Sequence, residues 1–234
     1  MKICVIPARG GSKRIPKKNI RDFCGKPIAA YSIEAAIASK CFDKVVVSTD
    51  DQEIADVAIE YGAEVPFMRP SELSDDFTGT NDVIKHAIKW YEDKGSVVSY
   101  ICCLYATAPF VNEVYLNEAY EKLVSSKKSY AFSVTSFPFP IQRAIRINKG
   151  DEVEAIWPEN IFKRSQDLEE AYHDAGQFYW GTNKAFCNNE VIFSSSSVAV
   201  LLPRHLVQDI DTLEDWYRAE LMYQSMQLQK QGKK

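Results

Sequence analysis

The chain opens with Lys2-Ile3-Cys4-Val5-Ile6-Pro7-Ala8, an apolar run that leads directly into Arg9-Gly10-Gly11-Ser12-Lys13. The apolar run predicts a buried strand, and the glycines after it predict a sharp loop. Adjacent glycines let the backbone turn so that several N–H groups face one anion, and flanking cations can neutralise that anion. The stretch therefore predicts a strand that ends in a phosphate-binding loop.

The positive charge of this loop is local. Six basic side chains and no acidic ones lie from Arg9 to Arg21, although the chain carries a formal net charge of −4. We interpret Arg14 and Lys17 as surface charge; the alternative for the whole loop is a solvated basic segment without a ligand. The residues that we assign to polyphosphate are Arg9, Gly10, Gly11, Ser12, Lys13 and Lys18.

Apolar strands and amphipathic helices alternate over the first 136 residues. This alternation is typical of an α/β fold with a mostly parallel sheet and helices on both faces, in a Rossmann-like arrangement. Ligands bind such sheets beyond the carboxyl ends of the strands, so we expect the site in the loops after Ala8, Thr49, Arg69 and Ala106. The predicted strands are residues 2–8, 44–49, 64–69, 99–106, 130–136, 176–181 and 197–202. The predicted helices are residues 27–39, from the Asp50-Asp51 cap to about 61, 81–94, 112–125 and 213–227, with a frayed tail at 229–234.

The alternation breaks after Phe137. Prolines, the turn Asn148-Lys149-Gly150-Asp151 and the charged stretch 163–170 follow it. We expect residues 138–174 to form an excursion from a single domain of residues 1–234, and long excursions usually cover a site or contact a partner.

An acidic pair stands near the C-terminal end, in Asp209-Ile210-Asp211-Thr212. Alternate residues of an extended segment project to the same side, so Asp209 and Asp211 can converge on one hard cation, for which we expect Mg²⁺. The alternative is that Asp211 or Thr212 only caps the next helix. Together with a phosphate loop, the pair predicts a metal site for phosphoryl or nucleotidyl transfer.

Further candidates follow the later strands. Arg69 opens Arg69-Pro70-Ser71-Glu72-Leu73, where its guanidinium can grip a phosphate or, alternatively, only form a salt bridge within the loop. The stretch from His173 to Trp180 mixes polar and aromatic side chains, as sugar pockets do, or is plain core.

Composition limits the partners and the compartment. An acidic chain with one basic loop suits a small anionic substrate better than nucleic acid. No apolar run approaches the roughly 20 residues of a membrane span, and the six cysteines lack zinc or CxxC spacing. We therefore expect an unexported cytoplasmic enzyme with reduced thiols, small-molecule substrates, and neither membrane nor nucleic-acid partners.

Four separated blocks together resemble a known family. They are Ile6 to Lys13 with Pro16 to Asn19, Arg69 to Leu73, Arg164 to Asp167, and Asp209 to Thr212. In this order they are similar to the acylneuraminate cytidylyltransferases, the CMP-sugar synthetases that activate acidic ulosonic sugars. The resemblance spans nearly the whole chain.

Two segments depart from the sialic acid enzymes of that family. Tyr105-Ala106-Thr107-Ala108-Pro109 stands where they carry Gln-Pro-Thr-Ser-Pro, and His173-Asp174-Ala175-Gly176 stands where they carry Arg-x-Asn-Gly. The stretch from Tyr172 to Trp180 looks like the pseudaminic acid branch of the family.

The resemblance implies a nucleotidyltransferase that moves CMP from CTP to a nine-carbon ulosonic acid and releases pyrophosphate. Pseudaminic acid is the expected acceptor, and legionaminic, sialic and Kdo acids are the alternatives. It also implies a homodimer, with the excursion as dimerisation arm. The implied CTP contacts are Arg9, Ser12, Lys18, Asn19, Arg69 and Thr80, of which Arg9 and Lys18 are the implied catalytic cations. The implied Mg²⁺ ligands are Asp209 and Asp211. The implied sugar contacts are Tyr105, Thr107, Arg164, Gln166, His173, Gln177 and Tyr179.

Two other readings remain from the residues alone. A metal-dependent nucleotide-sugar glycosyltransferase also joins a parallel sheet to an Asp-x-Asp pair, and a catalytically silent nucleotide-binding subunit needs only the loop. The density of basic residues favours the cytidylyltransferase, because a free triphosphate needs more neutralisation than a diphosphate-sugar.

Overall fold

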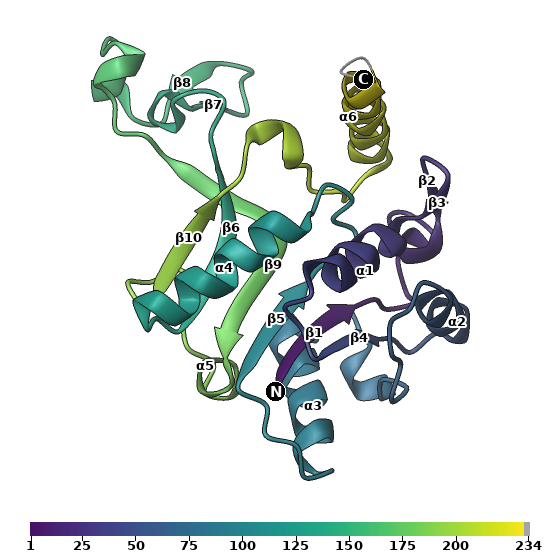
Figure 1. Ribbon diagram of the computed structural model, residues 1–234. Helices are drawn as coiled ribbons and strands as arrows, with labels where there is room; N and C mark the ends of the chain where they lie inside the picture. The colour runs from purple at the N-terminus through teal and green to yellow at the C-terminus, as the bar shows by residue number, and fades with distance from the viewer. Residues whose placement is uncertain (232–234) are drawn as a thin grey trace.

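A six-stranded sheet forms the centre of the computed structural model, which describes residues 1–231 (Figure 1). Its strand order is β10-β6-β9-β5-β1-β4. The sheet is mostly parallel, as predicted: β1 pairs in parallel with β4 and β5, and β10 with β6, while β9 runs antiparallel between β5 and β6. The strands of this sheet are β1 (Lys2–Pro7), β4 (Lys44–Ser48), β5 (Tyr100–Leu104), β6 (Tyr130–Ser136), β9 (Tyr172–Thr182) and β10 (Ser197–Leu201).

Helices cover both faces of the sheet, which confirms the α/β prediction. Helices α1, α2 and α4 contribute to one buried cluster, and α3 and α5 contribute to a second. Strand β1 shows the two-residue period of a strand buried on both sides, since Cys4 and Ile6 belong to the first cluster, whereas Ile3 and Val5 belong to the second. The helices are α1 (Ile28–Ser39), α2 (Gln52–Glu60), α3 (Thr80–Glu92), α4 (Glu113–Ser126), α5 (Asn183–Cys187) and α6 (Leu213–Gln231).

Three predicted elements were wrong in extent. Strand β9 begins at Tyr172, four residues before the predicted start at residue 176. Residues 64–69 form only isolated bridges, from Glu64 to Val46 of β4 and from Met68 to Thr49 just after it, because Pro66 has no N–H to donate to a continuous ladder. Helix α6 continues past the predicted end at residue 227 to Gln231, since no glycine or proline interrupts it before Gly232. Residues 229–231 of the predicted frayed tail are thus helical, and 232–234 lie outside the described residues.

The excursion predicted at residues 138–174 is an arm of residues 137–171 that projects from the sheet between β6 and β9 (Figure 1), because residues 172–174 already belong to β9. It carries the hairpin β7 (Ile145–Ile147) and β8 (Val153–Ala155). Apolar side chains of the arm are exposed, including Ile147 at 66% and Phe162 at 97%. Such exposure predicts a partner surface.

A third buried cluster joins the two ends of the chain. It includes Ile15 from the basic loop, Ile210 from the acidic segment and Trp216 from α6, each at most 1% exposed. Phe23 of the small hairpin β2 (Asp22–Phe23) and β3 (Lys26–Pro27) meets Trp216 edge to face at 5.5 Å. This cluster fixes residues 209–211 beside the N-terminal loop.

Replacing Ile210 by Ala should lower the free energy of unfolding by about 2 to 5 kcal/mol, because it opens a cavity in this cluster. Chemical denaturation monitored by Trp fluorescence measures the change. Ile59→Ala on the exposed face of α2, where Ile59 is 58% exposed, is the control and should stay within about 0.5 kcal/mol. Equal stability of the two variants would show that this cluster does not hold the ends together.

Candidate active site

A cleft of about 610 Å³ lies beyond the carboxyl ends of β1 and β5. This is the edge of the sheet at which the strand order predicted a ligand. The cleft unites the loop after β1, the loop after Arg69 and the loop after β5 with the segment that carries Asp211. The predicted site residues that line it are Arg9, Ser12, Lys13, Lys18, Asn19, Arg69, Thr80, Tyr105, Thr107 and Asp211.

The loop after β1 is held by hydrogen bonds to its own backbone and to the loop after β4. Asn19 donates from Nδ2 to the carbonyl of Arg9 at 2.9 Å, and the N–H of Gly10 donates to Oδ1 of Asp50 at 2.9 Å. Gly10 thus gives its N–H to a carboxylate and not to the cleft. Neither Gly10 nor Gly11 lines the cleft, so they shape the loop more than they contact a ligand there.

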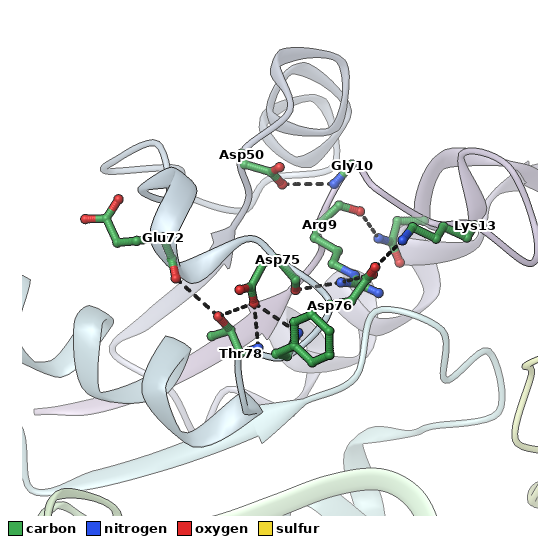
Figure 2. Close-up of polar contacts among 10 residues, drawn as sticks. Arg9, Gly10, Lys13, Asp50, Glu72, Asp75, Asp76 and Thr78 are labelled. Carbon is green, nitrogen blue, oxygen red and sulfur yellow. Dashed lines mark hydrogen bonds and ion pairs between the residues drawn. The ribbon is translucent and has the colours of Figure 1, made fainter.

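An acidic segment faces the basic loop across the cleft. Figure 2 shows the Arg9 guanidinium and the Lys13 ammonium reaching Asp76. Nη1 of Arg9 lies 2.9 Å from Oδ1 of Asp76 and also donates to the carbonyl of Asp75 at 2.7 Å. The cations predicted to hold phosphate therefore contact carboxylate and carbonyl oxygens of this segment.

The opposite wall of the cleft joins basic and acidic residues in a second set of contacts. Lys18 donates from Nζ to the carbonyl of Ile210 at 2.6 Å and lies 3.7 Å from Oδ1 of Asp211. Arg14 contacts the same Oδ1 at 2.9 Å. Arg14 was interpreted as surface charge, but it lines the cleft together with Asp211.

The acidic pair is electrostatically coupled to Lys18. Desolvation, followed by repulsion from Asp211, raises the pKa of Asp209, while Lys18 opposes the shift. Burial lowers the pKa of Lys18, and the charges of Asp211 and Asp209 oppose that change. Asp209 itself is exposed to solvent and is not among the residues that line the cleft.

These residues pass the test of donor chemistry for Mg²⁺. Magnesium is commonly bound through one or two carboxylates, substrate phosphates and several waters. Asp211 lines the cleft, and Asp209, which does not, is close enough to repel its charge, so this pair offers carboxylates of the kind that Mg²⁺ takes. Among residues 1–231, no group of three or more His, Cys, Asp or Glu side chains is arranged to hold a metal without help from a substrate.

Arg69 is only 6% exposed, and its guanidinium is fixed in the cleft wall. It donates from Nε to Oγ of Ser48 at 3.1 Å and from Nη2 to the Ser48 carbonyl. Burial lowers the pKa of the guanidinium, and the charge of Asp50 opposes this. A positioned, partly desolvated cation at the cleft wall suits a phosphate group.

The predicted sugar contacts of β9 lie beside Tyr105. The N–H of Tyr105 donates to the carbonyl of Gln177 at 2.8 Å, and the rings of Tyr105 and Tyr179 are 5.5 Å apart. Tyr179 donates its hydroxyl to the Asp174 carboxylate, and burial raises its pKa strongly. The Gln177 side chain donates to the carbonyl of Leu206 instead of to the cleft.

Five of the seven predicted sugar contacts do not line this cleft: Arg164, Gln166, His173, Gln177 and Tyr179. Arg164 and Gln166 belong to the arm, where Arg164 pairs with Asp167 at 2.7 Å. His173, at the start of β9, contacts the carbonyl of Asp174 through Nδ1 at 2.8 Å.

Sequence reasoning missed part of the acidic lining. Asp75 and Asp76 line the cleft, and Asp50 supports the basic loop from outside it. The signal that could have indicated them is the acidic pair six and seven residues after Arg69, in a segment already assigned to phosphate. Opposite charges in segments that converge on one cleft are expected to pair.

Comparisons with known proteins identify the family of the chain. A family model described as Cytidylyltransferase matches residues 3–213. The chain is 48% identical over 221 residues to the pseudaminic acid cytidylyltransferase of Campylobacter jejuni subsp. jejuni, covering 94% of this chain and 95% of that protein. It is 35% identical to the CMP-N,N'-diacetyllegionaminic acid synthase of Legionella pneumophila subsp. pneumophila, covering 93% of this chain and 94% of that protein.

A solved structure shares the fold. CMP:2-keto-3-deoxy-manno-octonic acid synthetase complexed with CTP aligns with a TM-score of 0.68 at 16% sequence identity, covering 96% of this chain and 99% of that chain. The two chains thus share an architecture over nearly their full lengths.

Adding a methyl group at Gly10 should disturb the loop, because a Cβ there would lie 2.7 Å from Oδ2 and 2.9 Å from Cβ of Asp51. Asp51 caps α2 by accepting from the N–H groups of Glu53 and Ile54. We expect Gly10→Ala to lower the free energy of unfolding by about 1 to 3 kcal/mol, as overpacking does.

Gly11→Ala is the matched control, since a Cβ at Gly11 meets nothing within 4 Å. Thermal unfolding by calorimetry compares the two variants. A Gly10→Ala protein as stable as Gly11→Ala would contradict the close approach of Gly10 to Asp51.

Proposed function

The chain belongs to the cytidylyltransferase family, and on this premise we propose that it transfers CMP from CTP to pseudaminic acid and releases pyrophosphate. The chain is a CTP-dependent nucleotidyltransferase of the CMP-sugar synthetase type. The observation that carries the choice of acceptor is the 48% identity to pseudaminic acid cytidylyltransferases over nearly the whole of both chains. The readings as a glycosyltransferase or a silent nucleotide-binding subunit do not fit this family.

In the proposed reaction the anomeric hydroxyl of the sugar acid attacks the α-phosphorus of CTP. A bond forms between the α-phosphorus and the sugar oxygen. The bond between the α-phosphorus and the oxygen that bridges to the β-phosphorus breaks, and pyrophosphate leaves with that electron pair. The hydroxyl proton passes to solvent. No covalent enzyme intermediate is required, so the protein contributes mainly orientation and charge stabilisation.

The loop after β1 would bind the triphosphate. Arg9, Ser12 and Lys13 line one side of the cleft and Arg69 another, so cations can surround a triphosphate held between them. Arg9 and Lys18 would stabilise the charge that develops on departing pyrophosphate. Ser48 already holds the Arg69 guanidinium in place, so this side chain loses less conformational entropy when a phosphate binds to it.

Asp209 and Asp211 would hold Mg²⁺. When bound there, the ion would supply positive charge that lowers the pKa of the attacking hydroxyl and neutralises phosphate charge. Lys18 contributes separately, because its contacts with Ile210 and Asp211 hold the acidic segment against the basic loop.

The sugar would bind on the β9 side of the cleft. Tyr105 and Thr107 line the cleft there, with Gln177 and Tyr179 beside or behind Tyr105. Arg164, Gln166 and His173 lie outside the cleft of their own chain, so we propose that the arm brings Arg164 and Gln166 to the site of a second copy. The exposed apolar residues of the arm support a homodimer.

We place the reaction in the cytoplasm. All six cysteines are free, which suits a reducing compartment. Across residues 1–231, no helix combines the length and apolar character required to cross a bilayer.

Pyrophosphate release from CTP tests the proposed reaction. With Mg²⁺ present, we expect release with pseudaminic acid to exceed release with legionaminic, sialic or Kdo acid, and chelation of the metal to abolish it. A coupled phosphate assay on this panel measures the rates. A preference for another acid would refute the acceptor, whereas no release with any acid would refute the reaction.

Asp211→Asn is the site variant for this assay, because it removes a carboxylate with little change of shape. We expect kcat to fall by about two orders of magnitude or more, with CTP binding largely retained. Glu214→Gln, at an exposed position of α6, is the charge-matched control and should keep normal turnover.

The arm is tested by Ile147→Asp, which puts a charge into the exposed apolar face of β7 beside Val153. We expect a monomer by light scattering, normal CTP binding, and loss of sugar-dependent turnover. Ile59→Asp, at a comparably exposed position on α2, is the control and should remain dimeric. A dimeric Ile147→Asp protein would exclude this face as the interface.

A further inference from the structure

A single carboxylate contacts two cations of the basic loop. Asp76 reaches Nη1 of Arg9 with Oδ1 at 2.9 Å and Nζ of Lys13 with Oδ2, as Figure 2 shows. Both cations line the cleft and are proposed above to bind the triphosphate. The Asp76 carboxylate therefore contacts the same two cations that a bound phosphate would contact.

The segment around Asp76 is folded to hold this carboxylate toward the loop. Oδ1 of Asp75 accepts from the N–H groups of Phe77 at 3.0 Å and Thr78 at 2.7 Å, and from the Thr78 hydroxyl at 2.7 Å. The Thr78 hydroxyl also lies 3.2 Å from the carbonyl of Glu72. Asp75 thus closes a turn and leaves Asp76 to face Arg9 and Lys13.

The contact is weak enough to exchange. The side chains of Arg9 and Asp76 are each 36% exposed, that of Lys13 is 79% exposed, and the neighbouring Phe77 is 94% exposed. Ion pairs at such exposure are strongly screened and contribute little to stability. An arriving polyanion can displace this carboxylate without disturbing the core.

We propose that Asp76 is an internal competitor for Arg9 and Lys13 that weakens the binding of polyphosphate and so eases the departure of pyrophosphate. The inference rests on the proposed function in taking pyrophosphate as the product. Asp76 and a phosphate that uses both cations exclude each other, so each such anion must first break the two ion pairs. CTP offsets this cost through contacts that pyrophosphate lacks, such as those of its cytidine.

The two possible roles of Asp76 predict opposite changes in anion binding when its charge is removed. If Asp76 only oriented Arg9 and Lys13, removing its charge would weaken anion binding. If Asp76 competes, removing its charge strengthens binding. Removing any carboxylate near the cleft also strengthens anion binding slightly, through the change in charge alone. A substitution of Asp82 measures that general effect for comparison. Asp82 is an exposed acid in the first turn of α3, and its Oδ1 lies 3.7 Å from Nζ of Lys85.

Calorimetric titration with inorganic pyrophosphate, in metal-free buffer of low ionic strength, tests the proposal. Asp76→Asn should lower the dissociation constant about fivefold, the scale of one or two exposed ion pairs, and the gain should shrink in high salt. Asp82→Asn should leave the constant near the wild-type value, and Asp76→Glu, which keeps the charge, should also resemble wild type. Unchanged or weaker binding by Asp76→Asn, or an equal gain in Asp82→Asn, would overturn the proposal.

Turnover gives a second readout. In Asp76→Asn the inhibition constant of pyrophosphate against CTP should fall in parallel with the dissociation constant, while KM for the sugar stays unchanged. The titration measures anion binding without catalysis. It therefore decides the role of Asp76 even if no acid in the panel releases pyrophosphate, which would refute only the proposed reaction.

Discussion

The burial of Ile15 and Ile210 in one apolar cluster is the constraint on which the site depends. Ile15 belongs to the basic loop, and Ile210 stands between Asp209 and Asp211. Their burial with Trp216 and its aromatic neighbours therefore brings the charged side chains of the two segments close together. The ion pairs alone are too weak for this task, since exposed pairs contribute about 0 to 1 kcal/mol. Apolar burial holds together two charged segments, and the hydrogen bond from Lys18 to Ile210 then sets their spacing.

The same arrangement explains why an acidic chain can bind a highly charged anion. Four cations of the cleft have an acidic partner on another segment: Arg9 and Lys13 face Asp76, and Arg14 and Lys18 face Asp211. These pairs compensate the positive charges of the cleft and so reduce the repulsion among clustered like charges. Buried Arg69 is different, because Ser48 fixes it without a charge.

Periodicity predicted most of the architecture because both faces of β1, β4, β5 and β6 are buried and the helices between them are amphipathic. It could not show that β9 enters antiparallel between β5 and β6, since apolar runs carry no information on direction. Pro66, visible in the sequence, interrupts the expected third strand. In the site, the residues within the N-terminal motif were predictable, whereas the partners Asp76 for Arg9 and Asp211 for Arg14 were not. Such pairs arise only when folding joins distant loops, and the choice of acceptor came from the resemblance.

Strand β9 has a practical consequence. It brings Gln177 and Tyr179 to Tyr105 from a late part of the chain, while the residues around Arg9, Arg69 and Asp211 come from other loops. The acceptor contacts and the nucleotide contacts that we propose therefore come from different segments of the chain. On that proposal, substitutions in β9 and at the end of β5 would change the choice of acceptor and leave the segments around Arg9 and Arg69 intact.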